Sequence, residues 1–152
     1  VAEPVADKLN IILGKNYSGL YNQDINITLA LKYFERLNEL FPDPSLALWA
    51  YHLGEGNLAR AMHAYIMASL GKTDEAKKEI SERFESKQES ATAFYTRLLG
   101  LNFVDLLTSK SAIKQLKDDQ AFGDDTQYYV ARVLAGDYLI QTTPQTKAES
   151  LF

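Results

Sequence analysis

The stretch from Ala47 to Asn57 holds the residues of this chain best suited to binding chemistry. Tyr51 and His52 end an apolar run, and Gly54-Glu55-Gly56-Asn57 follows almost at once. A phenol, an imidazole, a carboxylate and an amide can all hydrogen-bond a polar ligand, and glycines leave the backbone open to close approach. This pattern is typical of the edge of a cleft. A plain turn between two helices has the same spacing, so both interpretations remain open at this stage.

Metal and thiol chemistry are not expected. The chain has no cysteine, which excludes disulfides, thiolate metal sites and cysteine nucleophiles. His52 and His63 are its two histidines, and their separation does not match a metal-ligand spacing. We therefore expect no metal and no cofactor.

The composition predicts a single globular domain. Of the 152 residues, 46% are hydrophobic and 24% are charged, which is ordinary for a domain with one core. The net charge of −4 argues against a nucleic-acid partner, because such surfaces need clustered Lys and Arg. No apolar run approaches the roughly 18 residues of a transmembrane helix.

The elements that position the Ala47–Asn57 stretch are predicted to be helices. Asn26 is a candidate N-cap, and apolar residues recur after it at helical spacing. They are Ile27, Leu31, Phe34, Leu37 and Phe41. Residues 42–45, Pro-Asp-Pro-Ser, end this helix and start the next. The helix from Ser45 to Leu53 is apolar nearly all round, so we expect it to be central and buried. We expect Gly54 or Gly56 to adopt a positive φ where it ends.

More helices are predicted after this glycine corner, the residues 54–57. One begins at Leu58 and ends at Gly71, and the next is capped by Thr73. Residues 85–90 are predicted to be a polar linker, and residues 123–126 to introduce the last helix. The residues expected to face inward are Met62, Tyr65, Ile66, Ala76, Ile80, Phe84, Phe94, Leu98, Leu101, Val104, Ile113, Leu116, Val130, Val133, Leu134 and Tyr138. A first helix ending at Gly14 is also expected. No segment alternates with a period of two, so the predicted fold class is all-α.

Three segments carry a combined signature. The first, Asn26-Ile27-x-x-Ala30-x-x-Tyr33-Phe34, is close to the pattern Asn-Ile-x-x-Gly-x-x-Tyr-Leu. The second, residues 50–57, is close to Ala-Tyr-Asn-x-Gly-x-Gly, and the third, residues 125–134, to Glu-Thr-x-x-Tyr-Val-x-x-Val-Leu. In this order they resemble the lytic transglycosylase domain of the soluble-lytic-transglycosylase, goose-lysozyme-like type. The resemblance covers residues 1–70 and 123–140.

The resemblance implies how the domain is organised. Residues 1–141 would form a partial lysozyme-like helical domain, with a helical insertion at about 72–120. The polar sequence of residues 142–152 separately predicts a flexible tail. Within the insertion, we expect residues 85–120 to be an appendage whose removal leaves a folded remainder.

The resemblance also implies an activity. The family cleaves the β-1,4 bond between N-acetylmuramic acid and N-acetylglucosamine in peptidoglycan and leaves a 1,6-anhydro end. One Glu, in a Glu-Ser motif followed by Gly-Leu-Met-Gln, acts as acid and then as base. This chain lacks that motif pair: Glu89-Ser90 matches the dipeptide, but no Gly-Leu-Met-Gln follows. Glu3, Glu55 and Glu89 each fail on position. We therefore expect the catalytic Glu to lie outside this chain, and the chain alone to be inactive.

Several binding positions carry over from the family. Tyr51 corresponds to a tyrosine whose hydroxyl faces the catalytic carboxyl, His52 replaces an Asn, and Tyr129 matches the aromatic residue of the third segment. The implied substrate-binding residues are Tyr51, His52, Gly54, Glu55, Gly56, Asn57 and Tyr129. Peptidoglycan strands are the implied partner, and a bacterial periplasmic or otherwise extracytoplasmic location is implied. The alternative that Tyr51 and Tyr129 are ordinary core residues without a binding role also remains open.

Two other functions also remain open. The chain could be a catalytically inactive relative that binds glycan or a protein partner. It could instead be a tetratricopeptide-like helical scaffold, because residues 49–54 with Ala61, Tyr65 and Ala68 look superficially like such a repeat. A regular period of about 34 residues is not apparent, which weakens the scaffold interpretation.

Overall fold

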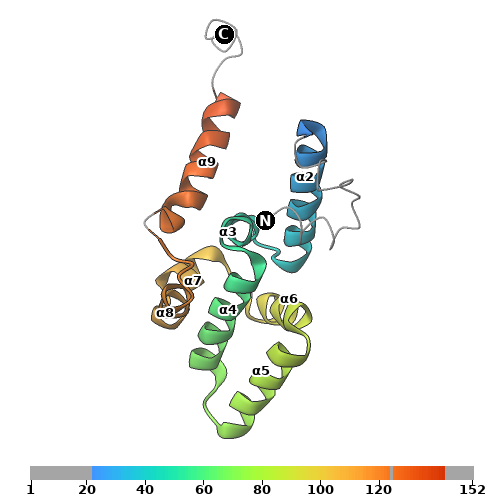
Figure 1. Ribbon diagram of the computed structural model, residues 1–152. Coiled ribbons are helices and arrows are strands. Elements are labelled where there is room, and N and C mark those ends of the chain that lie inside the picture. Colours follow the sequence, from blue (N-terminus) through green and yellow to red (C-terminus); the bar gives the residue numbers. More distant parts are fainter. Residues whose placement is uncertain (1–21, 124, 143–152) are drawn as a thin grey trace, which may run out of the picture.

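The chain forms an all-α fold in the computed structural model, which describes residues 22–123 and 125–142 (Figure 1). The described residues hold eight helices and no strand, which confirms the predicted fold class. The helices are α2 (Gln23–Leu40), α3 (Pro44–Leu53), α4 (Glu55–Leu70), α5 (Asp74–Ser86), α6 (Gln88–Leu99), α7 (Phe103–Thr108), α8 (Lys110–Asp118) and α9 (Thr126–Thr142). The expected first helix before Gly14, the candidate Glu3 and residues 143–152 of the tail lie outside the described residues.

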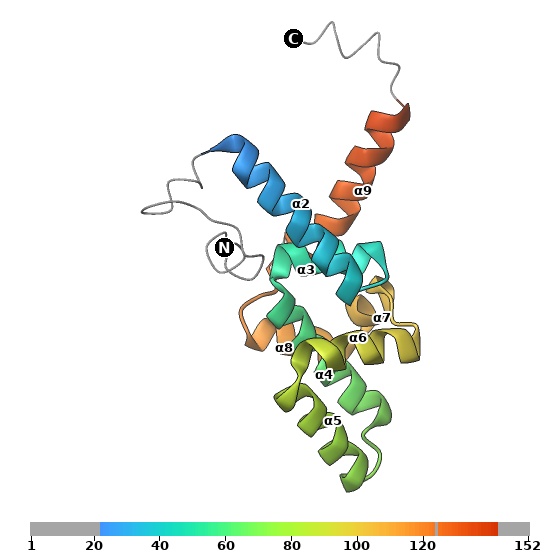
Figure 2. The same cartoon turned by 90° about the vertical axis from the view of Figure 1, so that its right-hand side faces the viewer.

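Helix α3 is the centre of the fold. Helices α2 and α9 extend from it toward one end of the molecule, and α4 and α5 extend toward the other (Figures 1 and 2). The prediction that this helix is buried is confirmed, because Leu46, Ala47, Trp49 and Ala50 have no exposed surface. The Trp49 indole N–H donates to the Thr126 carbonyl oxygen at 3.1 Å. Trp49 therefore connects α3 to the first residue of α9.

Local sequence explains where the central helix begins. Pro44 is the first residue of α3, where its missing N–H costs nothing, and the Asp43 side chain accepts from the Ser45 N–H at 2.9 Å. The other Asp43 oxygen accepts from the Phe103 N–H at 2.7 Å, at the start of α7. One carboxylate thus caps α3 and ties α7 to the same point. Gly71 ends α4 and Thr73 caps α5, as predicted.

Helix α2 begins earlier than predicted. Its N-cap is Asn22, whose side-chain oxygen accepts from the N–H groups of Asp24 and Ile25 at 3.0 and 3.2 Å. Asn26, the predicted cap, lies inside the helix. The prediction was wrong because Asn22, four residues earlier, already satisfies the N–H groups that a cap must satisfy.

Several helices turn a different face to the core from the predicted one. The predicted inward residues that are instead largely exposed are Ile27, Leu31, Phe94, Leu98, Val104, Leu134 and Tyr138. The residues buried in their place are Leu29 and Tyr33 in α2 and Ala91, Thr92, Tyr95 and Thr96 in α6. The Thr96 hydroxyl donates to the Thr92 carbonyl oxygen at 2.7 Å, so this threonine is buried with its polar group bonded.

The region predicted as linker and appendage is helical and contributes to the core. Helix α5 runs to Ser86 and α6 starts at Gln88, so Lys87 alone separates them and residues 85–90 are not a linker. Leu106 and Leu116, from α7 and α8, are fully buried in the same hydrophobic cluster as Trp49. Residues 85–120 therefore contribute buried side chains to the shared core, which argues against the appendage interpretation.

Candidate functional site

The glycine corner joins α3 directly to α4. Gly54 has φ 86° and ψ 136°, and its N–H donates to the Ala50 carbonyl oxygen at 2.8 Å. This confirms the predicted positive φ at one of the two glycines. Helix α4 begins at Glu55, three residues before the predicted Leu58, so Gly56 lies in its first turn without a positive φ. Gly54 is therefore the single residue between α3 and α4, and the chain changes direction there because glycine can adopt a positive φ.

Two predicted site residues of α3 lie on the side of α2 and α9. The His52 ring stacks on the Tyr129 ring of α9, with 4.2 Å between centroids and 12° between planes. The Tyr51 ring lies 5.8 Å from the Tyr33 ring and 6.4 Å from the Phe34 ring, both on α2. We call these five residues the aromatic cluster. It joins three helices, and Tyr51 keeps 39% of its surface exposed.

Two phenols of the aromatic cluster, those of Tyr33 and Tyr129, have a raised pKa. Burial raises the pKa of Tyr129, and the nearby Tyr51 phenol raises it further. Burial also raises the pKa of Tyr33, with the Arg36 guanidinium opposing and Tyr51 reinforcing the shift. Neutral phenols both donate and accept hydrogen bonds, which suits a ligand rich in hydroxyl and amide groups.

Glu55 and Gly56 line a separate hollow, which we call the acidic hollow. Its volume is about 140 Å³, and it lies between the C-terminal end of α2 and the starts of α4 and α6. Its lining is Leu40, Phe41, Glu55, Gly56, Ala59, Gln88, Glu89 and Thr92.

Arg36 of α2 links the two carboxylates of the acidic hollow. Its Nη2 lies 2.5 Å from Glu89 Oε1, and its Nε lies 3.8 Å from Glu55 Oε2. The fold thus brings together two of the carboxylates considered as the acid. Both form ion pairs, whereas a carboxyl group that must stay protonated to act as a general acid is favoured by an apolar cleft.

Asn57 takes part in a third group of contacts. Its Nδ2 donates to the Leu53 carbonyl oxygen at 2.6 Å, near the end of α3. Its Oδ1 accepts from Arg60, whose Nε donates to Asp119 Oδ2 at 2.9 Å. The hydrogen bond from Arg60 lowers the pKa of Asp119. These contacts fasten the first turn of α4 to the end of α8, so both polar ends of the Asn57 side chain serve the fold.

The seven predicted site residues are therefore divided around the corner. Tyr51, His52 and Tyr129 share the aromatic cluster, Glu55 and Gly56 line the acidic hollow, and Gly54 and Asn57 hold the turn itself. Tyr33 and Phe34 belong to the aromatic cluster and were not predicted as site residues. Their signal was present in the first of the three motif segments, which ends with this pair.

His63, the second histidine, lies apart from these groups against Phe84, with 4.7 Å between ring centroids. Burial lowers the pKa of His63, and Glu85 partly opposes this. Within residues 22–123 and 125–142, no group of three or more His, Asp or Glu side chains is arranged to hold a metal ion. The helices of this same part are also too short or too polar to cross a bilayer.

Comparison with known proteins gives a match to the first part of the chain. Residues 2–68 match the family model described as the transglycosylase SLT domain. This match supports the resemblance to a lytic transglycosylase-like domain over residues 2–68. The matched part includes α2, α3 and the glycine corner, and it ends inside α4. Neither curated proteins nor solved structures gave a match.

Proposed function

We propose that this chain forms one wall of a peptidoglycan-binding groove in a lytic transglycosylase whose catalytic glutamate lies outside the chain. The observation that carries the proposal is the stacking of His52 on Tyr129 beside Tyr51. Residue 129 lies beyond the part that matches the family, yet it packs against two of the motif residues. The wall thus uses the matched region and the last helix together.

The aromatic cluster has the chemistry that a glycan strand requires. Ring faces bind the apolar faces of sugars, and phenol and imidazole groups hydrogen-bond their hydroxyl and acetamido groups. Tyr51 is the most suitable positioning residue, because it is partly exposed and lies beside Tyr33 and Tyr129. Its hydroxyl would hydrogen-bond and orient a carboxyl group supplied from outside the chain.

Binding is tested by sedimentation of the purified chain with intact sacculi, and by NMR titration with soluble glycan strands. We expect Tyr51→Phe and Tyr129→Ala to weaken binding about tenfold, the loss of roughly 1.4 kcal/mol. Tyr128→Ala is the matched control, because Tyr128 is the neighbouring tyrosine of α9 and is 53% exposed. Equal losses in all three variants, or no binding by the wild type, would reject the proposed groove.

Cleavage is tested by chromatography for 1,6-anhydro products after incubation with sacculi. We expect none from this chain alone. Products that disappear in Glu55→Gln or Glu89→Gln would show that the acidic hollow supplies the acid, and that the catalytic part of the proposal is wrong.

A catalytically inactive relative is the second candidate, and the ion pairs of Glu55 and Glu89 with Arg36 favour it. It predicts binding to sacculi without cleavage, even after addition of a family segment that carries Glu-Ser and Gly-Leu-Met-Gln. A tetratricopeptide-like scaffold is less favoured, because the described helices pack around one central helix. Both favoured candidates place the protein outside the cytoplasm of a bacterium, where peptidoglycan is found.

A further inference from the structure

Helix α6 presents a hollowed apolar and basic surface that no residue of the aromatic cluster lines. Phe94 and Leu98 are 44% and 60% exposed there. Two adjoining hollows, of about 540 and 260 Å³, share Phe94 and Ser90. We call the residues Arg83, Lys87, Phe94, Arg97 and Leu98, all of which line these hollows, the α6 face.

The α6 face is basic on a chain that is acidic overall. Its two hollows are lined by three cationic residues and by no carboxylate, although the chain has a net charge of −4. Arg97 donates to the Glu39 backbone carbonyl at 3.1 Å, a neutral acceptor that leaves its charge in place. Lys87 forms no ion pair with any residue in the described ranges. This local excess of positive charge favours an anionic partner.

The cation nearest the ring is already positioned. The Arg83 guanidinium lies over the Phe94 ring, 5.0 Å from its centroid, and also bonds Glu79 at 2.9 Å. Stacking holds the guanidinium at the hollow while Glu79 neutralises part of its charge. Lys87 and Arg97 therefore supply most of the positive potential, one on each side of Phe94 along the helix.

We propose that the α6 face docks an acidic amphipathic helix of a partner protein. From Lys87 to Leu98 the face is roughly 16 Å long, about three helical turns. Hollows on both sides of Phe94 can receive apolar side chains spaced by one turn of a partner helix, and acidic side chains on its flanks would meet the cations. A lipid surface is less suited, because a flat surface leaves hollows unfilled. This inference is independent of the proposed glycan groove.

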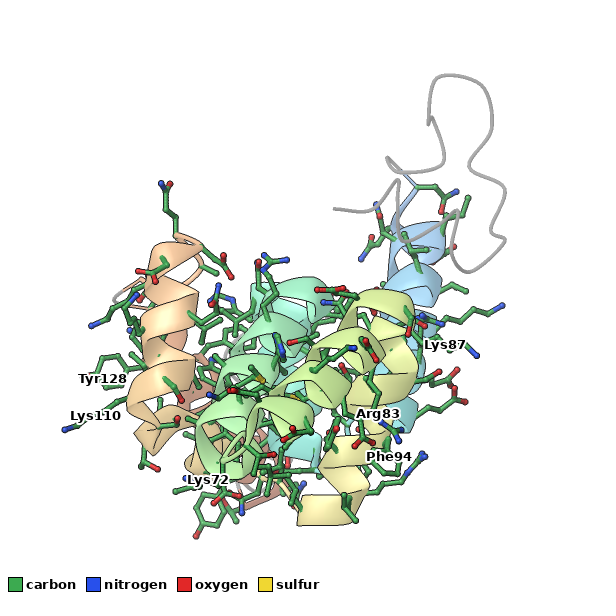
Figure 3. The ribbon with its side chains drawn as sticks, turned by 90° about the horizontal axis from the view of Figure 1, so that it is seen from below. Lys72, Arg83, Lys87, Phe94, Lys110 and Tyr128 are labelled. Atoms are coloured by element: carbon green, nitrogen blue, oxygen red, sulfur yellow. The ribbon has the colours of Figure 1, made fainter. Side chains whose placement is uncertain are left out.

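Figure 3 shows Arg83, Lys87 and Phe94 at one side of the molecule, with Lys110 and Tyr128 at the opposite side. This arrangement provides matched controls. Lys110→Glu makes the same charge change as Lys87→Glu at an exposed position. Tyr128→Ser removes an exposed ring, as Phe94→Ser does.

The experiment measures fluorescence anisotropy of a labelled model helix of about 14 residues, with leucine on one face and glutamate on the others. We expect the wild-type chain to bind it, and Lys87→Glu combined with Phe94→Ser to weaken binding at least tenfold, a difference of about 1.4 kcal/mol. The combined Lys110→Glu and Tyr128→Ser variant should bind like the wild type. A version of the peptide with lysine in place of glutamate should not bind.

Three results would overturn the proposal. They are failure of the wild-type chain to bind the acidic helix, equal loss of affinity in the two double variants, and sedimentation of the chain with phosphatidylglycerol vesicles without binding to the peptide. The last result would assign the α6 face to an anionic membrane surface. Far-UV circular dichroism of each variant checks that both substituted positions leave the fold intact.

Discussion

The paired substitutions Gly54→Ala and Gly56→Ala test the glycine corner most directly. Gly54 sits at φ 86° and ψ 136°, a region that residues with a Cβ rarely adopt. A Cβ added there would meet no atom closer than the Asn57 Nδ2 at 3.8 Å. The expected cost is therefore backbone strain without a clash, about 1–3 kcal/mol.

Gly56 presents the opposite case two residues later. It lies in the first turn of α4 without a positive φ, and an added Cβ would meet the Arg60 Nη1 at 3.8 Å. Alanine should fit without strain and restrict the unfolded chain, which stabilises by roughly 0.5–1 kcal/mol. The two variants should thus differ in free energy of unfolding by about 1.5–4 kcal/mol.

Urea denaturation followed by far-UV circular dichroism measures this difference. The midpoints should move in opposite directions while the slope of each transition stays that of the wild type. If Gly54→Ala is as stable as Gly56→Ala, the corner does not require its positive φ. If both variants lose stability equally, Gly56 has a constraint that its geometry does not reveal.

Three further predictions follow from the core. Trp49→Ala should cost about 3–5 kcal/mol of stability, and a loss below about 1 kcal/mol would contradict the central role of α3. Trp49→Phe should cost less, about 1–3 kcal/mol, because it removes the hydrogen bond to the Thr126 carbonyl oxygen. Because burial lowers the pKa of His63 below its ordinary 6.5, stability should be retained above pH 6.5 and fall as the pH drops through the folded-state pKa. Between pH 7.5 and pH 5.5, the free energy of unfolding should fall less for His63→Gln than for the wild type or for the exposed control His52→Gln. Equal falls in all three proteins would exclude His63 as the cause. Deleting residues 103–118 should abolish cooperative unfolding because Leu106 and Leu116 are fully buried, and a sharp transition in the deleted chain would restore the appendage interpretation.

The sequence predicted the elements that depend on local chemistry. The dense apolar run before Gly54 identified α3, and Pro44, Gly71 and Thr73 marked helix ends through their own backbone preferences. These signals need no knowledge of distant residues. The positive φ of Gly54 was predicted in the same way, from a glycine that lies between two apolar helical runs.

The choice of helix face could not be made locally. In α2, the stripe of Ile27 and Leu31 and the stripe of Leu29 and Tyr33 have the same spacing, and contacts with other helices decide between them. In α6, Phe94 was predicted to be buried because it is more hydrophobic than Thr96, yet the structure buries Thr96 instead. The buried Thr96 hydroxyl donates a hydrogen bond to the Thr92 carbonyl oxygen.

The arrangement around the corner was equally hidden from the sequence. Arg36 pairs with Glu55 and Glu89. The three residues come from three different helices, and no local sequence pattern links them. The stacking of His52 on Tyr129 joins the second and third motif segments. The motifs identified these residues separately, but only the packing of α9 on α3 shows which of them meet.

The hydrogen bond between Trp49 and Thr126 gives the molecule an internal optical reporter. Trp49 is the single tryptophan of the chain, it is fully buried, and its indole N–H is bonded to the first residue of α9. If α9 swings away from α3, the indole exchanges that carbonyl for water and its emission shifts to longer wavelength, while the other helices keep their circular dichroism. A red shift that precedes the loss of ellipticity during denaturation would therefore time the release of α9, separately from the melting of the rest of the fold.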